Sequence, residues 1–146
     1  MTSKIVKNKE PLLVIIDSNP PSMSEFLAIK SLLTTNKTII IGIKGNMNGV
    51  MDINKVIEMW ILAFNGIEGI DILIIPNNHM TDAYFIDKLK KNFKRIAVKD
   101  KLEWVYYSTR GYEMVNLPYV PGYEPLFLAQ AYRQSIAYRY LQKYVR

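Results

Sequence analysis

Polar side chains that could take part in chemistry follow two apolar runs of the sequence. After residues 12–16 come Asp17, Asn19, Ser22 and Ser24, and after residues 71–75 come Asn77, Asn78 and His79. Both runs are continuous and rich in β-branched residues, which is typical of strands buried on both faces of a parallel sheet. In doubly wound folds, ligands bind at the carboxyl ends of such strands. Asp17 could therefore bind Mg²⁺ or a ribose hydroxyl, or it could cap the turn that follows.

Catalytic and metal-binding patterns are missing from the sequence. His79 is the single histidine, and the chain contains no cysteine. Disulfides, thiol catalysis and Cys-ligated zinc are therefore excluded. A lone loop histidine without a second ligand makes no metal site, and a surface position is its commoner role. With no Ser-His-Asp arrangement, P-loop or GxGxxG motif, the sequence predicts no catalytic residue, metal or cofactor.

The spacing of apolar residues predicts alternating strands and helices. The expected strands are residues 12–16, 38–43, 71–75 and 95–99. The first helix is expected over residues 22–33. The second is capped by Asp52 and ends before Gly66, and the third begins at Thr81 or Asp82. This order predicts an α/β, Rossmann-like, doubly wound and mostly parallel sheet of four to five strands, with helices on both faces.

The third predicted helix has an apolar and a basic side. Its packing contacts are expected to be Tyr84, Phe85, Leu89 and Phe93. Its exposed side consists of Lys88, Lys90, Lys91 and Lys94.

The chain beyond residue 99 has a different character. Residues 102–107 are predicted as a further strand, and residues 108–111 as a turn or the start of a helix. A proline-rich loop over residues 116–125 then leads to an amphipathic C-terminal helix over residues 125–144. The apolar stripe of that helix is Ala129, Tyr132, Ile136, Ala137, Tyr140, Leu141 and Tyr144, and mainly outside it lie Arg133, Arg139, Lys143 and Arg146.

Positive charge is concentrated in the last part of the chain. Residues 1–86 contain seven Lys or Arg and eight Asp or Glu, whereas residues 87–146 contain twelve and five. This asymmetry indicates an acidic partner, such as nucleic acid, a nucleotide or an acidic protein surface, with a solvated basic surface as the alternative. The basic stretch 88–101 contains few aromatic residues on which single-stranded bases could stack, although phosphate contact stays open.

Tyrosine and arginine, which are enriched at protein interfaces, crowd the last 40 or so residues. The predicted partner-binding residues are Lys88, Lys91, Lys94, Tyr132, Arg133, Arg139, Tyr140, Lys143 and Tyr144. The alternative is that the final helix packs on its own sheet.

Residues 19–26 read Asn-Pro-Pro-Ser-Met-Ser-Glu-Phe. They resemble the Asn-Pro-Pro-His-x-Gly-His signature of nucleotidylyltransferases, above all the nicotinate/nicotinamide mononucleotide adenylyltransferases. Residues 75–85 look like that family's segment after its third strand, and residues 95–100 look like the strand that follows. Ser108-Thr109-Arg110 is similar to the family's Ser/Thr-rich helix start, which binds the triphosphate. The resemblance covers residues 12–110. It implies a Rossmann-like fold and vestigial nucleotide-binding positions at Asp17, Asn19, Ser22, Ser24, Asn77, Asn78, His79, Ser108, Thr109 and Arg110.

The chain departs from this family at the residues that perform the chemistry. The family's two histidines stabilise charge that develops on the α-phosphate during adenylyl transfer. Here those positions are Ser22 and Glu25, and the glycine between them is Ser24. A carboxylate at Glu25 would repel a triphosphate. Ser22-x-x-Glu25 has the pattern of a capping box, which stabilises a helix by about 1 kcal/mol and occupies the N-terminus where an anion would bind.

Three functions are compatible with these observations. The sequence favours a catalytically degenerate nucleotidylyltransferase-like protein that is a non-enzymatic structural or binding subunit of a larger assembly, for example a viral particle. The alternative is a divergent nucleotidylyltransferase or nucleotide-binding regulator that uses Asp17, Asn77, Asn78, Ser108, Thr109 and Arg110. A weaker alternative is a nucleic-acid-binding module that uses residues 88–101. Protein partners or homo-oligomers are expected.

Length and hydropathy predict one domain over residues 1–146. Its core is expected at 11–110, and 111–146 form a loop and helix that could dock on a partner. No apolar run approaches the roughly 20 residues that span a bilayer, and no signal-peptide pattern follows the N-terminus. The expected location is the cytoplasm or a viral particle, with no membrane partner.

Overall fold

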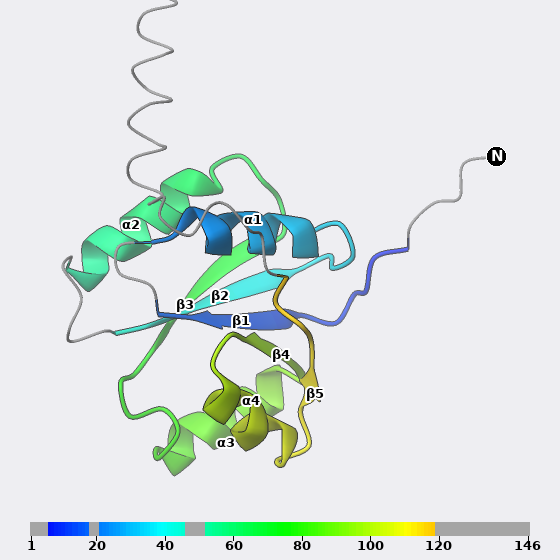
Figure 1. Cartoon of the computed structure of the whole chain (residues 1–146), viewed down its shortest axis with the longest axis vertical. Coiled ribbons are helices and arrows are strands. Elements are labelled where there is room, and N and C mark those ends of the chain that lie inside the picture. The colour runs from blue at the N-terminus through cyan, green and yellow to red at the C-terminus, as the bar shows by residue number, and fades with distance from the viewer. Residues whose placement is uncertain (1–5, 18–20, 46–51, 119–146) are drawn as a thin grey trace, which may run out of the picture.

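The computed structural model describes residues 6–17, 21–45 and 52–118, in which strands and helices alternate (Figure 1). In chain order the elements are β1 (Leu12–Ile16), α1 (Met23–Leu32), β2 (Ile39–Lys44), α2 (Ile53–Ala63), β3 (Ile70–Ile75), α3 (Ala83–Asn92), β4 (Arg95–Val98), α4 (Lys101–Ser108) and β5 (Glu113–Met114). Asn19 and the predicted helix over residues 125–144 lie outside the described residues. Within the described ranges, no helix is long and apolar enough to cross a membrane.

The strands of the described sheet are all parallel, in the order β3-β2-β1-β4-β5. In the central strand β1, Val14 pairs with Ile41 of β2 on one side and with Ala97 of β4 on the other. Helices α1 and α2 cover one face of the sheet, and α3 and α4 cover the other (Figure 1). The chain therefore moves outward from β1 to β3 and then crosses to the far side of β1. The predicted Rossmann-like α/β fold is confirmed.

Strand β1 contributes to two apolar cores, because successive side chains of a strand point to opposite faces of the sheet. Leu12, Val14 and Ile16 belong to the cluster beneath α1 and α2. Leu13 and Ile15 belong to the cluster beneath α3 and α4. All five side chains are at most 3% exposed, as the unbroken apolar run predicts for a central parallel strand.

The helix boundaries follow the predicted caps. Ser22, Asp52 and Asp82 each precede a helix, and the side chain of each accepts a hydrogen bond from a backbone N–H of the first turn. After α2, Gly66 has φ of 80°, the left-handed conformation that was predicted there.

Residues 102–107 belong to helix α4, so the predicted strand is wrong. Asp100 caps this helix by accepting hydrogen bonds from the N–H groups of Leu102 and Glu103, at 2.7 and 3.2 Å. The buried positions, Glu103 and Tyr107, are four residues apart, which is the helical spacing. The aromatic and β-branched composition of this stretch is typical of a strand, but the polar cap and the period determine a helix.

The end of α4 changes the interpretation of the residues that follow. Ser108 is the last residue of the helix and Thr109 its C-cap, and residues 109–111 form a turn. Of the two alternatives predicted for residues 108–111, the turn is therefore confirmed and the helix start is wrong. Strand β5, which pairs with β4, was not predicted, because two residues are too short to show a period. The sheet thus continues beyond residue 110, where the core was expected to end.

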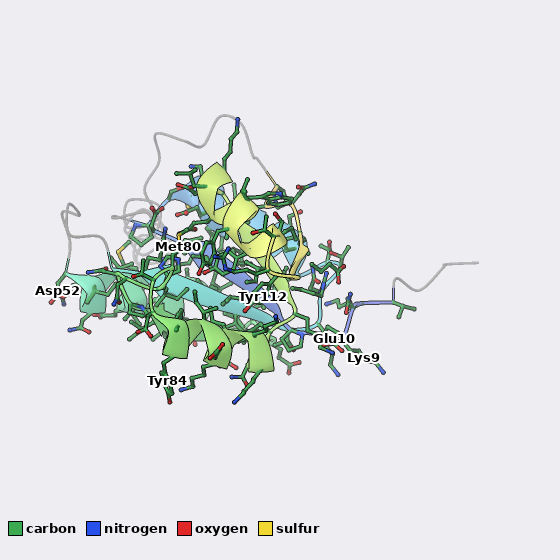
Figure 2. All side chains as sticks on the ribbon, turned by 90° about the horizontal axis from the view of Figure 1, so that it is seen from below. Lys9, Glu10, Asp52, Met80, Tyr84 and Tyr112 are labelled. Carbon is green, nitrogen blue, oxygen red and sulfur yellow. The ribbon has the colours of Figure 1, made fainter. Side chains whose placement is uncertain are left out.

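Two predicted burials are also wrong. Strand β3 is the outer strand of the described sheet rather than a fully buried one, and Ile74 is 59% exposed. The Tyr84 side chain is 78% exposed and points away from α3 (Figure 2), because α3 faces the sheet through Phe85 and Leu89.

Candidate functional site

The carboxyl end of the sheet is the candidate site, because ligands of doubly wound folds bind there. All helices of a parallel βαβ fold begin at this end, so their first turns meet the ends of the strands. Polar side chains come from the ends of β1 and β2, the turn between β3 and α3, and the first turn of α4: Asp17, Lys44, His79 and Glu103.

Glu103 contacts two other members of this group. Its Oε1 lies 2.5 Å from Lys44 Nζ and 3.2 Å from His79 Nε2. The side chains of Glu103 and His79 are 6% and 5% exposed, and that of Lys44 is 17% exposed. Asp17, whose Oδ2 lies 3.8 Å from Lys44 Nζ, is far more exposed. We call Lys44, His79 and Glu103 the carboxyl-end cluster.

The charges within this cluster compensate one another. Burial alone would raise the pKa of the Glu103 carboxyl, but the hydrogen bonds from His79 and Lys44 and the charge of Lys44 outweigh burial and lower the pKa below 4.5. Glu103 is therefore ionised at neutral pH, and the ammonium of Lys44 neutralises it. Because an unpaired buried charge is costly, each of these two residues depends on the other.

His79 is enclosed by aromatic rings, so the surface position expected for it is wrong. Its ring stacks on Tyr107 at 6.4 Å between centroids and meets the edge of Phe85 at 6.5 Å. Next to it, the Tyr106 hydroxyl donates to the carbonyl of Met80 at 2.6 Å and ties the β3–α3 turn to α4. Nδ1 of His79 has no hydrogen-bond partner among the described residues.

The neighbouring tyrosines supply no phenolate to this site. Burial, and secondarily the charge of Glu103, raises the pKa of the Tyr107 phenol. Burial likewise raises the pKa of Tyr112. Within the part of the chain that the structure describes, the Tyr107 hydroxyl has no hydrogen-bond partner.

The structure brings most of the predicted nucleotide-binding residues to the carboxyl end. They lie after β1, at the start of α1 and after β3: Asp17, Ser22, Ser24, Asn77, Asn78 and His79. Asp17, Asn77 and Asn78 are exposed, whereas Ser22 is engaged as the cap of α1, at 3.2 Å from the N–H of Glu25.

Ser108, Thr109 and Arg110 are separated from that group. Helix α4 begins at the carboxyl end and runs back, so its last residues lie toward the amino end of the sheet. The guanidinium of Arg110 lies 3.5 Å from the centroid of the Tyr106 ring and donates to the Tyr106 carbonyl at 2.9 Å. Arg110 is thus held on its own helix.

The basic residues of α3 and of the segment that follows it form a separate surface. Lys88, Lys91 and Lys94 are exposed, as predicted. Beside them, a groove of about 410 Å³ is lined by Lys90, Phe93, Lys94, Gly111, Tyr112 and Glu113. The other predicted partner-binding residues lie outside the described ranges: Tyr132, Arg133, Arg139, Tyr140, Lys143 and Tyr144.

Lys44 and Glu103 were not identified from the sequence. Lys44 resembled the first residue of a flexible loop, and Glu103 was hidden within a predicted strand. Asp100-x-x-Glu103 has the spacing of a helix start, and a helix there would have placed Glu103 at the carboxyl end of the sheet. No pattern in the sequence indicates that it pairs with a lysine 59 residues away.

The described residues contain no group of three or more His, Asp or Glu placed to hold a metal ion. The chain matches no known protein-family model, and the search of curated proteins found no significant match.

Proposed function

We propose that this chain is a catalytically degenerate, nucleotidylyltransferase-like subunit that performs no adenylyl transfer and binds other components of a larger assembly. The carboxyl-end cluster is the observation that supports this proposal. A phosphate site needs cations and backbone N–H groups that are free to meet an anion. Here the Lys44 ammonium lies 2.5 Å from Glu103 and is already neutralised.

The helix starts add negative charge to the same end of the sheet. All four described helices are capped by a side-chain oxygen, and three of the caps are aspartates: Asp52, Asp82 and Asp100. These carboxylates favour the helices through the macrodipole, but they oppose the approach of a phosphate. Lys99 and Lys101 are exposed at this end, on either side of Asp100.

The positions of the family's histidines also argue against adenylyl transfer. Ser22 accepts a hydrogen bond from the N–H of Glu25, as a helix cap does. The Glu25 side chain is only 4% exposed and lies within the helix start. Neither residue can place a positive charge beside an α-phosphate as a protonated histidine does.

An assembly role fits the rest of the surface. Large apolar side chains are exposed on α2, on the β3 edge and on α3 and α4, among them Ile61, Ile74, Tyr84 and Leu102. Exposed apolar residues and a basic helix face are suited to partner proteins. A viral particle is one setting that such a small, charged module would suit.

Calorimetry with ATP, CTP and NAD, each with and without Mg²⁺, tests this proposal together with an assay for released pyrophosphate. We expect no binding tighter than about 1 mM, equivalent to about −4 kcal/mol, and no pyrophosphate. Lys101→Ala at the carboxyl end and Lys94→Ala, between α3 and β4, form a matched pair. Micromolar binding that Lys101→Ala weakens and Lys94→Ala does not would contradict the proposal.

The second candidate is a nucleotide-binding regulator, and one observation favours it. Nδ1 of His79 is buried without a partner among the described residues, at the end of the sheet where a nucleotide would lie. The same calorimetry separates the two candidates, because a regulator binds nucleotide and releases no pyrophosphate.

A further inference from the structure

A groove of about 410 Å³ lies along the outer edge of the sheet, between α2 and β3. Its lining residues come from the end of α2, the turn after it and the first half of β3: Trp60, Ile61, Phe64, Asn65, Gly66, Ile70, Asp71 and Ile72. Most of them are apolar, and β3 has no further strand beside it in the described sheet. We call this the α2–β3 groove.

Apolar side chains are also exposed around this groove. Ile61 is 56% exposed and Leu62 39% on α2, Ile67 is 37% exposed in the turn, and Ile74 is 59% exposed on β3. Single exposed apolar residues are ordinary, but a group of them around an apolar groove at an open sheet edge marks an interaction surface.

We propose that the α2–β3 groove is the docking site for residues 125–144 of this same chain, bound as an amphipathic helix. The apolar residues of this segment recur at helical spacing, so a helix formed by it would have an apolar stripe that is stabilised by burial. An apolar groove with a strand edge on one side and a helix on the other accepts such a stripe.

The end of the described chain lies on the same face of the sheet as α2. Val115 and Leu117 follow β5, at the opposite edge of the sheet from β3, and pack against the core cluster to which Trp60 and Phe64 of the groove belong. From Pro118 to residue 125 the chain can extend by roughly 25 Å, since each residue adds at most about 3.5 Å. A short tether gives a high effective concentration, which favours docking within one molecule over docking between two.

Charge complementarity supports the same occupant. Residues 52–72, which form α2, the turn after it and the first part of β3, contain Asp52, Glu58, Glu68 and Asp71 against Lys55, and Asp71 lines the groove. Residues 125–146 contain four basic residues and no acidic one: Arg133, Arg139, Lys143 and Arg146. These basic residues lie mainly outside the apolar stripe, where they can meet an acidic rim while the stripe is buried.

This inference rests on the proposed assembly role and makes it more specific. Docking would bury Tyr132, Tyr140 and Tyr144 in the groove. Its failure would leave the nucleotide experiments unaffected, because the groove lies at the edge of the sheet and involves none of the carboxyl-end cluster.

Cysteine pairs test the docking in the full chain, which has no cysteine of its own. Ile61→Cys is combined in turn with Tyr132→Cys, Ile136→Cys and Tyr140→Cys, and disulfides are formed by mild oxidation. The control places the first cysteine at Lys88→Cys, on the exposed side of α3 beneath the other face of the sheet. We expect one Ile61 pair to close within the monomer at least about tenfold more than its Lys88 counterpart, given the effective concentration of a tethered segment.

Charge reversal tests whether the acidic residues near the groove contribute to docking. Glu68→Lys and Asp71→Lys, added to the pair that closes best, should lower its yield several-fold and lower it less at high salt. Yields from Ile61 pairs no higher than from Lys88 pairs would overturn the proposal. Disulfide-linked dimers in place of closed monomers would also overturn it and assign the groove to a second copy of the chain.

Discussion

The two ends of the sheet are built in a similar way, although parallel sheets usually keep one of them open for ligands. In Figure 2, Asp52 marks the carboxyl end and Glu10 the amino end. At the amino end, a guanidinium Nη1 of Arg95 donates to Asn36 Oδ1 at 2.7 Å and to the Glu10 carbonyl at 3.3 Å. At the carboxyl end, Lys44 donates to Glu103 at 2.5 Å.

Each end thus ties a cation to a partner 59 residues away in the sequence. At the amino end, this contact connects β4 to the segments that precede β1 and β2. We infer that the carboxyl-end cluster has the same purpose, and that the end of the sheet that would hold a nucleotide now stabilises the fold. The difference lies in the main acceptor. Nη1 of Arg95 is bound by neutral oxygens, and the exposed Glu113 carboxylate lies 4.0 Å from its Nε. Lys44 is bound by the buried Glu103 carboxylate, so the carboxyl end should respond more strongly to acid.

The largest effect is expected from breaking the pair at the carboxyl end. Glu103→Leu leaves the partly buried ammonium of Lys44 with only the exposed Asp17 carboxylate, 3.8 Å away. It should lower the free energy of unfolding by about 3 kcal/mol, as measured by urea denaturation. The double variant Lys44→Met with Glu103→Leu should recover most of this loss, because no charge is then left unpaired. A Glu103→Leu variant as stable as the wild type would show that the cluster is not structural.

At the amino end, Asn36→Leu should cost less. It removes a neutral acceptor from Arg95 and a donor to the Leu32 carbonyl, and Arg95 keeps its bond to the Glu10 carbonyl. A loss of about 1–3 kcal/mol is expected in the same urea experiment. A loss larger than that of Glu103→Leu would reverse the ranking of the two ends.

Acid should act mainly on the carboxyl end, because the Glu113 carboxylate near Arg95 is 4.0 Å away and exposed. Because the pKa of Glu103 is lowered in the folded protein, its contribution is fully present above pH 4.5 and is lost as the pH falls through the folded value. The stability advantage of the wild type over Glu103→Gln should therefore shrink as the pH falls below 4.5 in thermal melts. Asn36→Leu should keep a constant difference from the wild type over that range, and a parallel decline in both variants would contradict the distinction.

The smallest effects are expected from two adjacent tyrosines of α4. Tyr106→Phe removes the hydrogen bond to the Met80 carbonyl and should cost about 1 kcal/mol. Tyr107→Phe removes a buried hydroxyl that has no partner among the described residues, so it should leave stability unchanged or slightly increased. Equal losses in the two variants, measured by thermal unfolding, would mean that the Tyr107 hydroxyl has a partner.

The sequence predicted the fold more completely than the site, for physical reasons. The strand β1 and the caps Ser22, Asp52 and Asp82 are local features, which a short window of sequence contains. Helix α4 was missed because its composition is that of a strand. The exposure of Tyr84 was missed because the helical spacing of apolar residues does not show how wide the buried side of the helix is.

The carboxyl-end cluster depends on pairing across the fold. Lys44 and Glu103 meet only because β2 and α4 end and begin at the same edge of the sheet, and His79 joins them only because the β3–α3 turn folds inward. Neither the burial of His79 nor its contact with Glu103 follows from residues nearby in the sequence. The resemblance to a nucleotidylyltransferase motif directed attention to this edge of the sheet, but it did not identify Lys44 or Glu103.

His79 provides the decisive measurement, because it is the only histidine and its imidazole gives a single set of proton resonances. The ring lies inside the carboxyl-end cluster, 3.2 Å from Glu103, so a nucleotide that entered this end of the sheet would disturb it. In an NMR titration with ATP and Mg²⁺, we predict that the His79 resonances stay in place up to millimolar nucleotide. A saturable shift at micromolar nucleotide would contradict the proposal that this end of the sheet has become part of the structural core.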